Sequence, residues 1–141
     1  MVPLGDVPRV DYLPCVASLE TTSLTPDERQ LLEAFAARLQ DRLGASLHAV
    51  WLFGSRARGE PPRGPDSDVD LLVLVDDASW DGKVTVQFDL DDAAEELGLQ
   101  DLTPWFAAHV DTPAWLKQRR EIKSFFIAEI DRDKVVVIGE L

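Results

Sequence analysis

The chain has 141 residues, of which 45% are hydrophobic and 28% charged, proportions typical of a globular protein with one core. Its 26 acidic residues against 14 basic ones give a formal net charge of -12, and because no basic stripe is evident, a long nucleic acid is not expected as a partner. A single cysteine, no signal-like N-terminus and no apolar run long enough to cross a bilayer predict a cytoplasmic protein without membrane contact.

Two unequal parts are expected along the chain. Residues 1–24 contain three prolines and no sustained hydrophobic period, which predicts an irregular N-terminal arm with a short extended piece at residues 10–13. Residues 25–141 are expected to form one domain, because their apolar runs and turn signals follow each other without a linker.

The domain is predicted to open with a helix. Thr25 can cap it, Pro26 suits its first position, and Glu28 stands three residues after the cap, as in a capping box. Leucine and phenylalanine then recur at helical spacing until Gly44, which is expected to end the helix.

A polar pair ends the first predicted strand. Residues 47–53 form an apolar run of strand length, and Gly54 and Ser55 follow it directly. Glycine allows a ligand to approach the backbone, and Ser55 could cap a short helix at residues 56–58 whose free N–H groups attract phosphate. Arg58 could neutralise phosphate charge from the same side. An ordinary strand-to-helix turn is the alternative for this pair alone.

Two acids open the second predicted strand. A proline-rich loop at residues 60–66 is followed by Asp68 and Asp70, which lead into the apolar run 71–75. On a strand their side chains share one face about 7 Å apart, where they repel each other unless a cation lies between them. Paired carboxylates suit Mg²⁺, which completes its shell with water and phosphate oxygens. A solvated strand start is the alternative for these acids alone.

The second half of the chain contains weaker signals. Residues 76–99 fit a strand by alternation and equally a helical face that would end at Gly98. A third strand is predicted at residues 102–110, one helix starting at Thr112 and continuing to about residue 130, and a short strand at residues 135–138.

Both halves of the Gly54 to Asp70 region together resemble the minimal nucleotidyltransferase (MNT) domain of the DNA polymerase β-like nucleotidyltransferase superfamily. The resemblance covers the chain from about Thr25 to its end, and it is carried by Gly54, Ser55, Ala57, Arg58, Gly59, Ser67, Asp68, Asp70 and Leu71. It implies an α/β (α+β) nucleotidyltransferase fold, a small mixed sheet flanked by helices, with a helix within residues 76–99.

The resemblance also implies a reaction. A nucleoside monophosphate, AMP in the leading interpretation, would pass from a nucleoside triphosphate such as ATP to a hydroxyl acceptor. Asp68 and Asp70 would be the catalytic residues and Mg²⁺ ligands, while Gly54, Ser55 and Arg58 would bind the nucleotide.

The chain is too short for the extra domain with which drug- or tRNA-modifying relatives bind their acceptor, and the resemblance to minimal members implies that the acceptor is another protein. Similar minimal proteins resemble antitoxins paired with a HEPN-domain ribonuclease, and a net charge of -12 suits the masking of a basic partner. A homo-oligomer is the other expected assembly, since dimerisation would let a short chain build a deeper pocket for a small acceptor.

One departure from the family pattern leaves two functions open. Active members usually carry a third carboxylate on the third strand, where this chain has Leu-Thr-Pro-Trp at residues 102–105. Asp101 either shares a strand face with Thr103 and replaces this acid, or lies in the loop before the strand. The chain is therefore predicted to be a transferase or, alternatively, a catalytically degenerate binding module that acts as an antitoxin.

Overall fold

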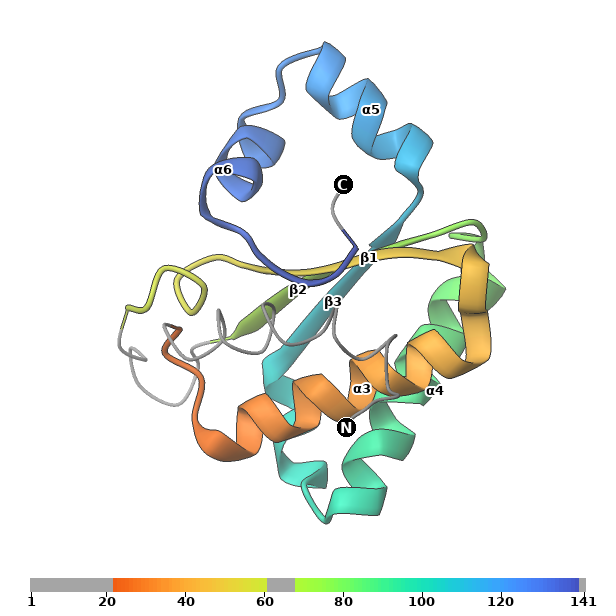
Figure 1. Cartoon of the computed structure of the whole chain (residues 1–141), viewed down its shortest axis with the longest axis vertical. Coiled ribbons are helices and arrows are strands. Elements are labelled where there is room, and N and C mark those ends of the chain that lie inside the picture. Colours follow the sequence, from red (N-terminus) through yellow and green to blue (C-terminus); the bar gives the residue numbers. More distant parts are fainter. Residues whose placement is uncertain (1–21, 61–67, 140–141) are drawn as a thin grey trace, which may run out of the picture.

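The computed structural model describes residues 22–60 and 68–139, and these form a four-stranded mixed sheet covered by helices on both faces (Figure 1). The strands lie in the order β3-β2-β1-β4, with β1 antiparallel to β2 and β4, and β2 parallel to β3. Their bounds are β1 Leu47–Phe53, β2 Val69–Val75, β3 Phe106–Asp111 and β4 Val135–Ile138. The predicted α+β fold with a small mixed sheet is confirmed.

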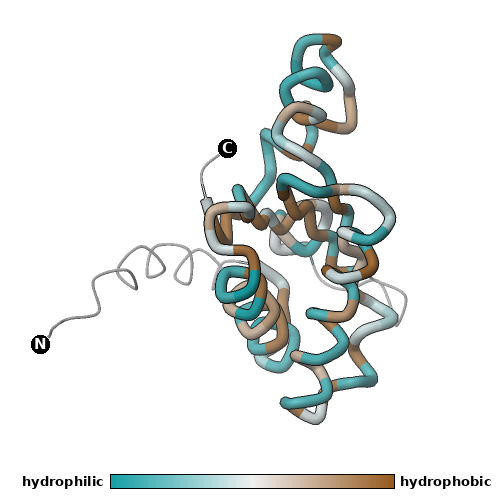
Figure 2. The backbone as a smooth tube through the Cα atoms, turned by 90° about the vertical axis from the view of Figure 1, so that its right-hand side faces the viewer, coloured by the Kyte–Doolittle hydropathy of each residue, from teal (hydrophilic) through white to brown (hydrophobic). Residues whose placement is uncertain are grey.

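Helices α3 (Pro26–Leu43) and α4 (Trp80–Leu97) cover one face of the sheet, and α5 (Pro113–Glu121) and α6 (Phe125–Asp133) cover the other (Figure 1). The two central strands are therefore buried on both sides, which explains why they are almost continuously hydrophobic. Figure 2 shows brown, hydrophobic stretches of the backbone in the middle of the molecule. No helix in the described ranges is long and apolar enough to cross a membrane.

Alternate residues of the central strands build two separate cores. Leu71 and Val73 of β2 point toward the α3 and α4 side, whereas Leu72 and Leu74 pack with Leu116, Ile127 and Ile130 from α5 and α6. Because side chains alternate along a strand, Asp70 lies on the same face as Leu72 and Leu74, under α5 and α6.

The first helix begins and ends where the sequence indicates. The Thr25 hydroxyl accepts a bond from the Glu28 N–H at 3.1 Å, and the Glu28 carboxylate accepts one from the Thr25 N–H at 2.9 Å, which completes the capping box. Gly44 ends the helix with a φ of 52°.

The ambiguous segment after β2 is a helix. Ser79 caps α4, and Gly98 ends it in the left-handed conformation with a φ of 70°. Val86 and Leu90 are buried in the core shared with α3, while Phe88, between them in the sequence, is exposed. Burial at helical spacing thus outweighs the alternation that resembled a strand.

The prediction of a strand from residue 102 is wrong. Gln100–Trp105 forms the 3-10 helix η2, and β3 begins only at Phe106. Pro104 has no N–H to donate to a strand partner, and the Leu102 N–H instead bonds to the Leu99 carbonyl at 3.0 Å. The turn bonding therefore holds this segment out of the sheet.

The prediction of one long helix after Thr112 is also wrong, because α5 and α6 are separated at residues 122–124. The Lys123 N–H bonds to the Arg120 carbonyl and the Ser124 N–H bonds to the Arg119 carbonyl, at 3.1 and 3.0 Å. This is the Schellman pattern that ends a helix, with Lys123 in the left-handed region at a φ of 56°.

We expect the substitution Lys123→Gly to raise the free energy of unfolding by about 1 kcal/mol, because glycine adopts the left-handed conformation without the steric cost of a Cβ. Urea denaturation of the two proteins measures the difference. Lys123→Ala is the control, since alanine keeps the Cβ and should leave the stability within about 0.5 kcal/mol. Equal stabilities of the glycine and alanine variants would contradict the left-handed conformation of Lys123.

Several sequence-based expectations lie outside the described residues. They are the extended piece at residues 10–13, almost the whole arm at 1–24, most of the loop at 60–66, and Ser67.

Candidate functional site

The two halves of the predicted motif meet at the end of β1. Phe53 pairs with Asp70 across the antiparallel strands, and Gly54 follows with a φ of +81°. A Cβ on Gly54 would lie 2.6 Å from Oδ2 of Asp70, a distance that carbon and oxygen atoms do not tolerate. The missing side chain therefore lets the Asp70 carboxylate lie against the backbone that leads into Ser55.

The predicted short helix at residues 56–58 is not present, and a compact turn takes its place. The Arg58 N–H bonds to the Gly54 carbonyl at 3.2 Å, and the Glu60 N–H bonds to the Ser55 carbonyl at 3.0 Å. These bonds span different numbers of residues, so the turn does not continue the regular pattern of an α-helix. The turn nevertheless starts at Gly54, so its first backbone N–H groups are next to Asp70.

Arg56 anchors this turn to the start of α3. Arg56 is 1% exposed, and its Nη2 donates to the Glu28 carboxylate and, at 2.9 Å, to the Ser23 carbonyl. Its Nε donates to the Ser23 hydroxyl at 3.0 Å. The sequence offered no signal for this role, because the pair is separated by 28 positions and arginine is usually exposed.

The two predicted acids have different surroundings. Asp68 is exposed just before β2, whereas Asp70 is partly buried on the strand. Burial raises the pKa of Asp70, the charge of Asp68 raises it further, and His109 opposes the change. A half-buried carboxylate beside a second carboxylate is therefore held at an energetic cost that a bound cation would relieve.

This pair of carboxylates fits Mg²⁺. Magnesium typically takes one or two protein carboxylates and keeps waters or phosphate oxygens in its other positions. The described ranges contain no group of three or more His, Cys, Asp and Glu side chains arranged to hold a metal ion. Asp68 and Asp70 would therefore supply the protein ligands, and phosphate and water the remainder.

The predicted nucleotide-binding residues are brought together only in part. Gly54 and Ser55 lie at Asp70, as expected. Arg58 instead bonds to Glu60 at 2.7 Å and to Asp133 of α6 at 3.3 Å. A phosphate ligand would have to displace at least one of these carboxylates, so the phosphate-binding role of Arg58 stays a prediction.

The strand β3 places no third carboxylate directly beside Asp70. Asp101 lies in η2 and not on a strand, which excludes the interpretation that it shares a strand face with Thr103. On the face of Asp70, β3 presents Ala107 directly beside it and then His109. His109 was not predicted as a site residue, because its place beside the Asp70 face depends on the pairing of β3 with β2, which no local pattern shows.

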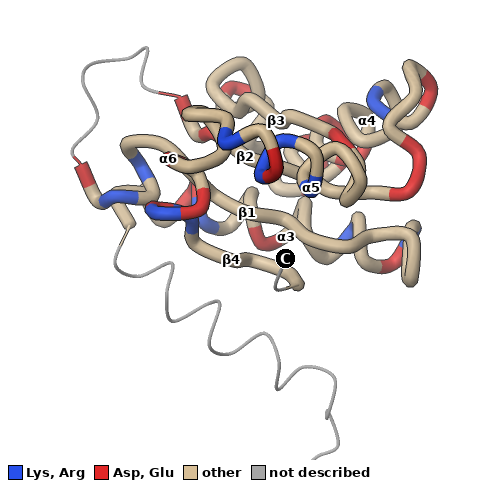
Figure 3. The backbone as a smooth tube through the Cα atoms, turned by 90° about the horizontal axis from the view of Figure 1, so that it is seen from above, with Lys and Arg blue, Asp and Glu red and all other residues tan. Residues whose placement is uncertain are grey.

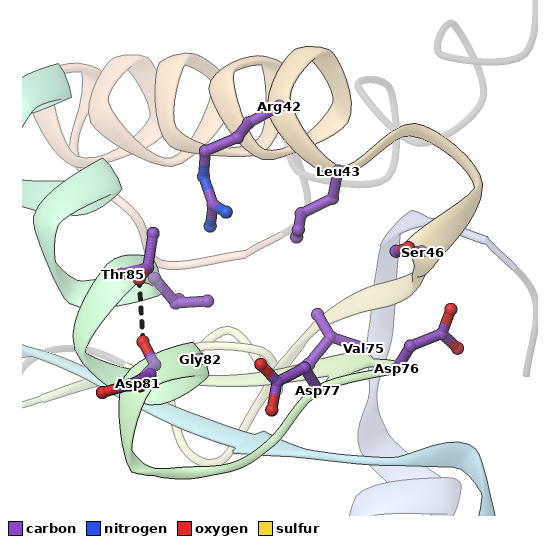
Figure 4. Close-up of a pocket in the computed structure, with 10 residues that line it drawn as sticks. Arg42, Leu43, Ser46, Val75, Asp76, Asp77, Asp81, Gly82 and Thr85 are labelled. Carbon is purple, nitrogen blue, oxygen red and sulfur yellow. Dashed lines mark hydrogen bonds between the residues drawn. The ribbon is translucent and has the colours of Figure 1, made fainter.

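Two surface pockets are found away from these residues. One, of about 180 Å³, lies at the opposite end of β2 from Asp70, and Figure 4 shows Arg42 across this pocket from Asp77 and Asp81. The Arg42 side chain is already paired with Asp89 of α4. The other, of about 360 Å³, lies on α5, and its lining includes Lys117 and Arg120. Neither lining includes Gly54, Ser55 or the two motif acids, so the candidate site is defined by the motif residues and their contacts and not by one of these pockets.

Gly54→Ala is expected to lower both stability and ligand binding. The alanine would carry the left-handed cost of about 1–2 kcal/mol and would push the Asp70 carboxylate from its position. Gly98→Ala is the matched control, since Gly98 has a φ of +70° and nothing within 4 Å of its Cβ position. Thermal unfolding and Mg²⁺–ATP titration compare the variants, and equal effects on ATP affinity would show that contact with Asp70 is unimportant.

Comparison with known proteins agrees with this geometry. The family model described as "Polymerase beta, Nucleotidyltransferase" matches residues 43–138, which run from the last residue of α3 to the end of β4 and include every candidate residue. A search of curated proteins finds no match. With its matched segment covering most of the domain, the chain belongs to the polymerase β nucleotidyltransferase family.

Proposed function

We propose that the protein is an Mg²⁺-dependent nucleotidyltransferase that moves AMP from ATP to a hydroxyl group on a partner protein. The observation that carries this proposal is the contact between the Gly54 backbone and the Asp70 carboxylate, which only glycine permits. It joins a backbone suited to phosphate with an acid suited to a divalent cation. Family membership supports nucleotidyl transfer as the general chemistry.

The residues have distinct roles in this proposal. Asp68 and Asp70 would hold Mg²⁺, which supplies charge neutralisation on the triphosphate and on the attacking and leaving oxygens. The turn after Gly54 positions the phosphates with its backbone, and Arg56 keeps that turn in place. The acceptor oxygen forms a bond to the α-phosphorus, the bond to pyrophosphate breaks, and the hydroxyl proton passes to water.

The second candidate function is a binding module without turnover. It is favoured by β3, which places Ala107 beside Asp70 where a third acid would serve as general base. In this case the fold would serve only to bind a partner protein. The proposed partner is a basic HEPN-domain ribonuclease. The net charge of -12 supports a basic partner in both cases.

Transfer of label from ATP separates the two functions. The protein is incubated with Mg²⁺, a cell extract that supplies acceptor hydroxyls, and ATP labelled at either the α- or the γ-phosphate. Protein-bound label from the α-phosphate alone, abolished by EDTA, is the expected result. Label from the γ-phosphate would indicate phosphoryl transfer instead, and no label from either would favour the binding module.

As the pH is lowered, the affinity for Mg²⁺–ATP is expected to fall at a higher pH than it would if Asp70 had the pKa of an ordinary aspartate. Burial and Asp68 raise the pKa of Asp70, so its carboxylate takes up a proton at a higher pH and then no longer binds the cation. Titration calorimetry from pH 7.5 downward, over the range in which the circular dichroism shows a folded protein, measures the midpoint. A midpoint at or below the ordinary aspartate value of 3.8 would contradict this expectation.

A further inference from the structure

Three rings from three different elements form a cluster on the Asp70 face of the sheet. Phe53 of β1 lies 5.8 Å from His109 of β3 and 5.8 Å from Phe126 of α6, measured between ring centroids. His109 and Phe126 are 6.2 Å apart, with their planes at 66°. These separations are those of interacting aromatic pairs, so the three side chains make one continuous surface.

This aromatic cluster borders the candidate metal ligands. Phe53 is the direct cross-strand partner of Asp70. His109 pairs with Leu72, which is two residues further along β2 on the same face, and its charge acts on Asp70. A molecule held at Asp70 by its phosphates therefore has the aromatic cluster within reach of its other end.

The aromatic cluster exposes more ring surface than the packing of the core requires. Phe53 is buried, but His109 is exposed and Phe126 keeps 43% of its surface accessible. The inward face of α6 is already filled by Ile127 and Ile130, which are almost fully buried. Phe126 therefore leaves an accessible ring face in the cluster that borders Asp70, and an accessible apolar surface bordered by polar groups suits ligand binding.

We propose that His109 and Phe126, supported from below by Phe53, form the surface on which the nucleobase of the nucleotide stacks. This inference rests on the proposed function, since it places the base of the same nucleotide whose phosphates bind at Asp70. A nucleotide carries its base one ribose away from its phosphates, and the base is the flat, uncharged part that aromatic rings accept. Stacking depends little on which base is present, so ATP and GTP should bind with similar affinity.

Titration calorimetry with two ligands tests the inference. Mg²⁺–ATP carries a base, and Mg²⁺–tripolyphosphate carries only the phosphates. Phe126→Ala is expected to weaken ATP binding by about tenfold or more and to leave tripolyphosphate binding unchanged. Because Phe126 is partly exposed, this variant should fold, and its thermal unfolding is recorded alongside.

Three further variants sharpen the comparison. Phe125→Ala is the matched control, because Phe125 is 89% exposed on the same helix and takes no part in the three ring contacts. It should leave the affinities for both ligands unchanged. His109→Ala should weaken ATP binding, and His109→Phe should restore it, since a ring without a titratable group is enough for stacking.

The possible failures are distinguishable. If the wild-type protein binds neither ligand, the proposed function fails and the inference fails with it. If the wild-type protein binds ATP but Phe126→Ala binds it equally well, only the inference is overturned, and a loss of transfer in that variant would then assign the surface to the acceptor. Equal losses of affinity for ATP and tripolyphosphate would also overturn the inference, because the substitution would then act on phosphate binding and not on the base.

Discussion

Replacement of Asp70 by asparagine is expected to weaken Mg²⁺-dependent ATP binding strongly and to make the ligand-free protein more stable. Asparagine keeps the shape of the side chain but removes the negative charge that a divalent cation requires. We expect ATP affinity in Mg²⁺ to fall at least about tenfold and nucleotidyl transfer to fall on the order of 100-fold.

The gain in stability has a separate physical cause. Burial and the neighbouring Asp68 raise the pKa of Asp70, so folding disfavours its charged form. The resulting contribution to stability is present at low pH and is lost as the pH rises through the raised pKa. At neutral pH the neutral asparagine avoids this cost, and the melting temperature in EDTA should rise.

Asp111→Asn is the matched control for this experiment. Asp111 lies on the same sheet face, and burial also raises the pKa of its side chain, but its partner on β2 is Leu74 and not Asp70. It should leave Mg²⁺–ATP affinity unchanged. Unaltered ATP binding in Asp70→Asn would remove the basis for a metal site at this position.

The sequence predicted those parts of the site whose signals are local. Strands β1 and β2 were found because both are continuous apolar runs, and Gly54 with Asp70 because glycine and acid stand at the ends of those runs. The capping box of α3 was likewise found within four consecutive residues, beginning at Thr25. Each of these features depends on neighbours in the chain, so a pattern of residues was sufficient.

The features that sequence reasoning missed depend on contacts between distant segments. The start of β3 at Phe106 is decided by its pairing with β2, and without it His109 could not be placed beside Asp70. The break at Lys123 is decided by turn bonding in a residue type that rarely adopts a positive φ. The aromatic cluster joins β1, β3 and α6, and no periodicity within one element could indicate it.

Replacement of Arg56 by methionine is expected to be the most destabilising of the changes considered. The guanidinium is buried, and its removal leaves the Glu28 carboxylate, itself almost buried, without its charged partner. Breaking a buried ion pair from one side typically costs about 3–5 kcal/mol, a large part of the stability of a small domain. Urea denaturation measures the loss of free energy of unfolding.

Two variants show whether burial is the cause. Arg58→Met alters an arginine of the same turn whose partners are exposed or partly exposed, and it should cost no more than about 1 kcal/mol. Combining Arg56→Met with Glu28→Met should recover part of the loss, because neither charge is then buried alone. A loss below about 1 kcal/mol in Arg56→Met would show that the pair is not buried in solution.

The same variant links stability to the site. Arg56 holds the turn after Gly54 through Ser23 and Glu28, and the turn presents its backbone beside Asp70. Arg56→Met should therefore weaken Mg²⁺–ATP binding even at temperatures where the variant is fully folded, whereas Lys123→Gly should not. An unchanged affinity in folded Arg56→Met would mean that the turn holds its shape through its own hydrogen bonds, and the role of Arg56 would then be confined to the attachment of α3.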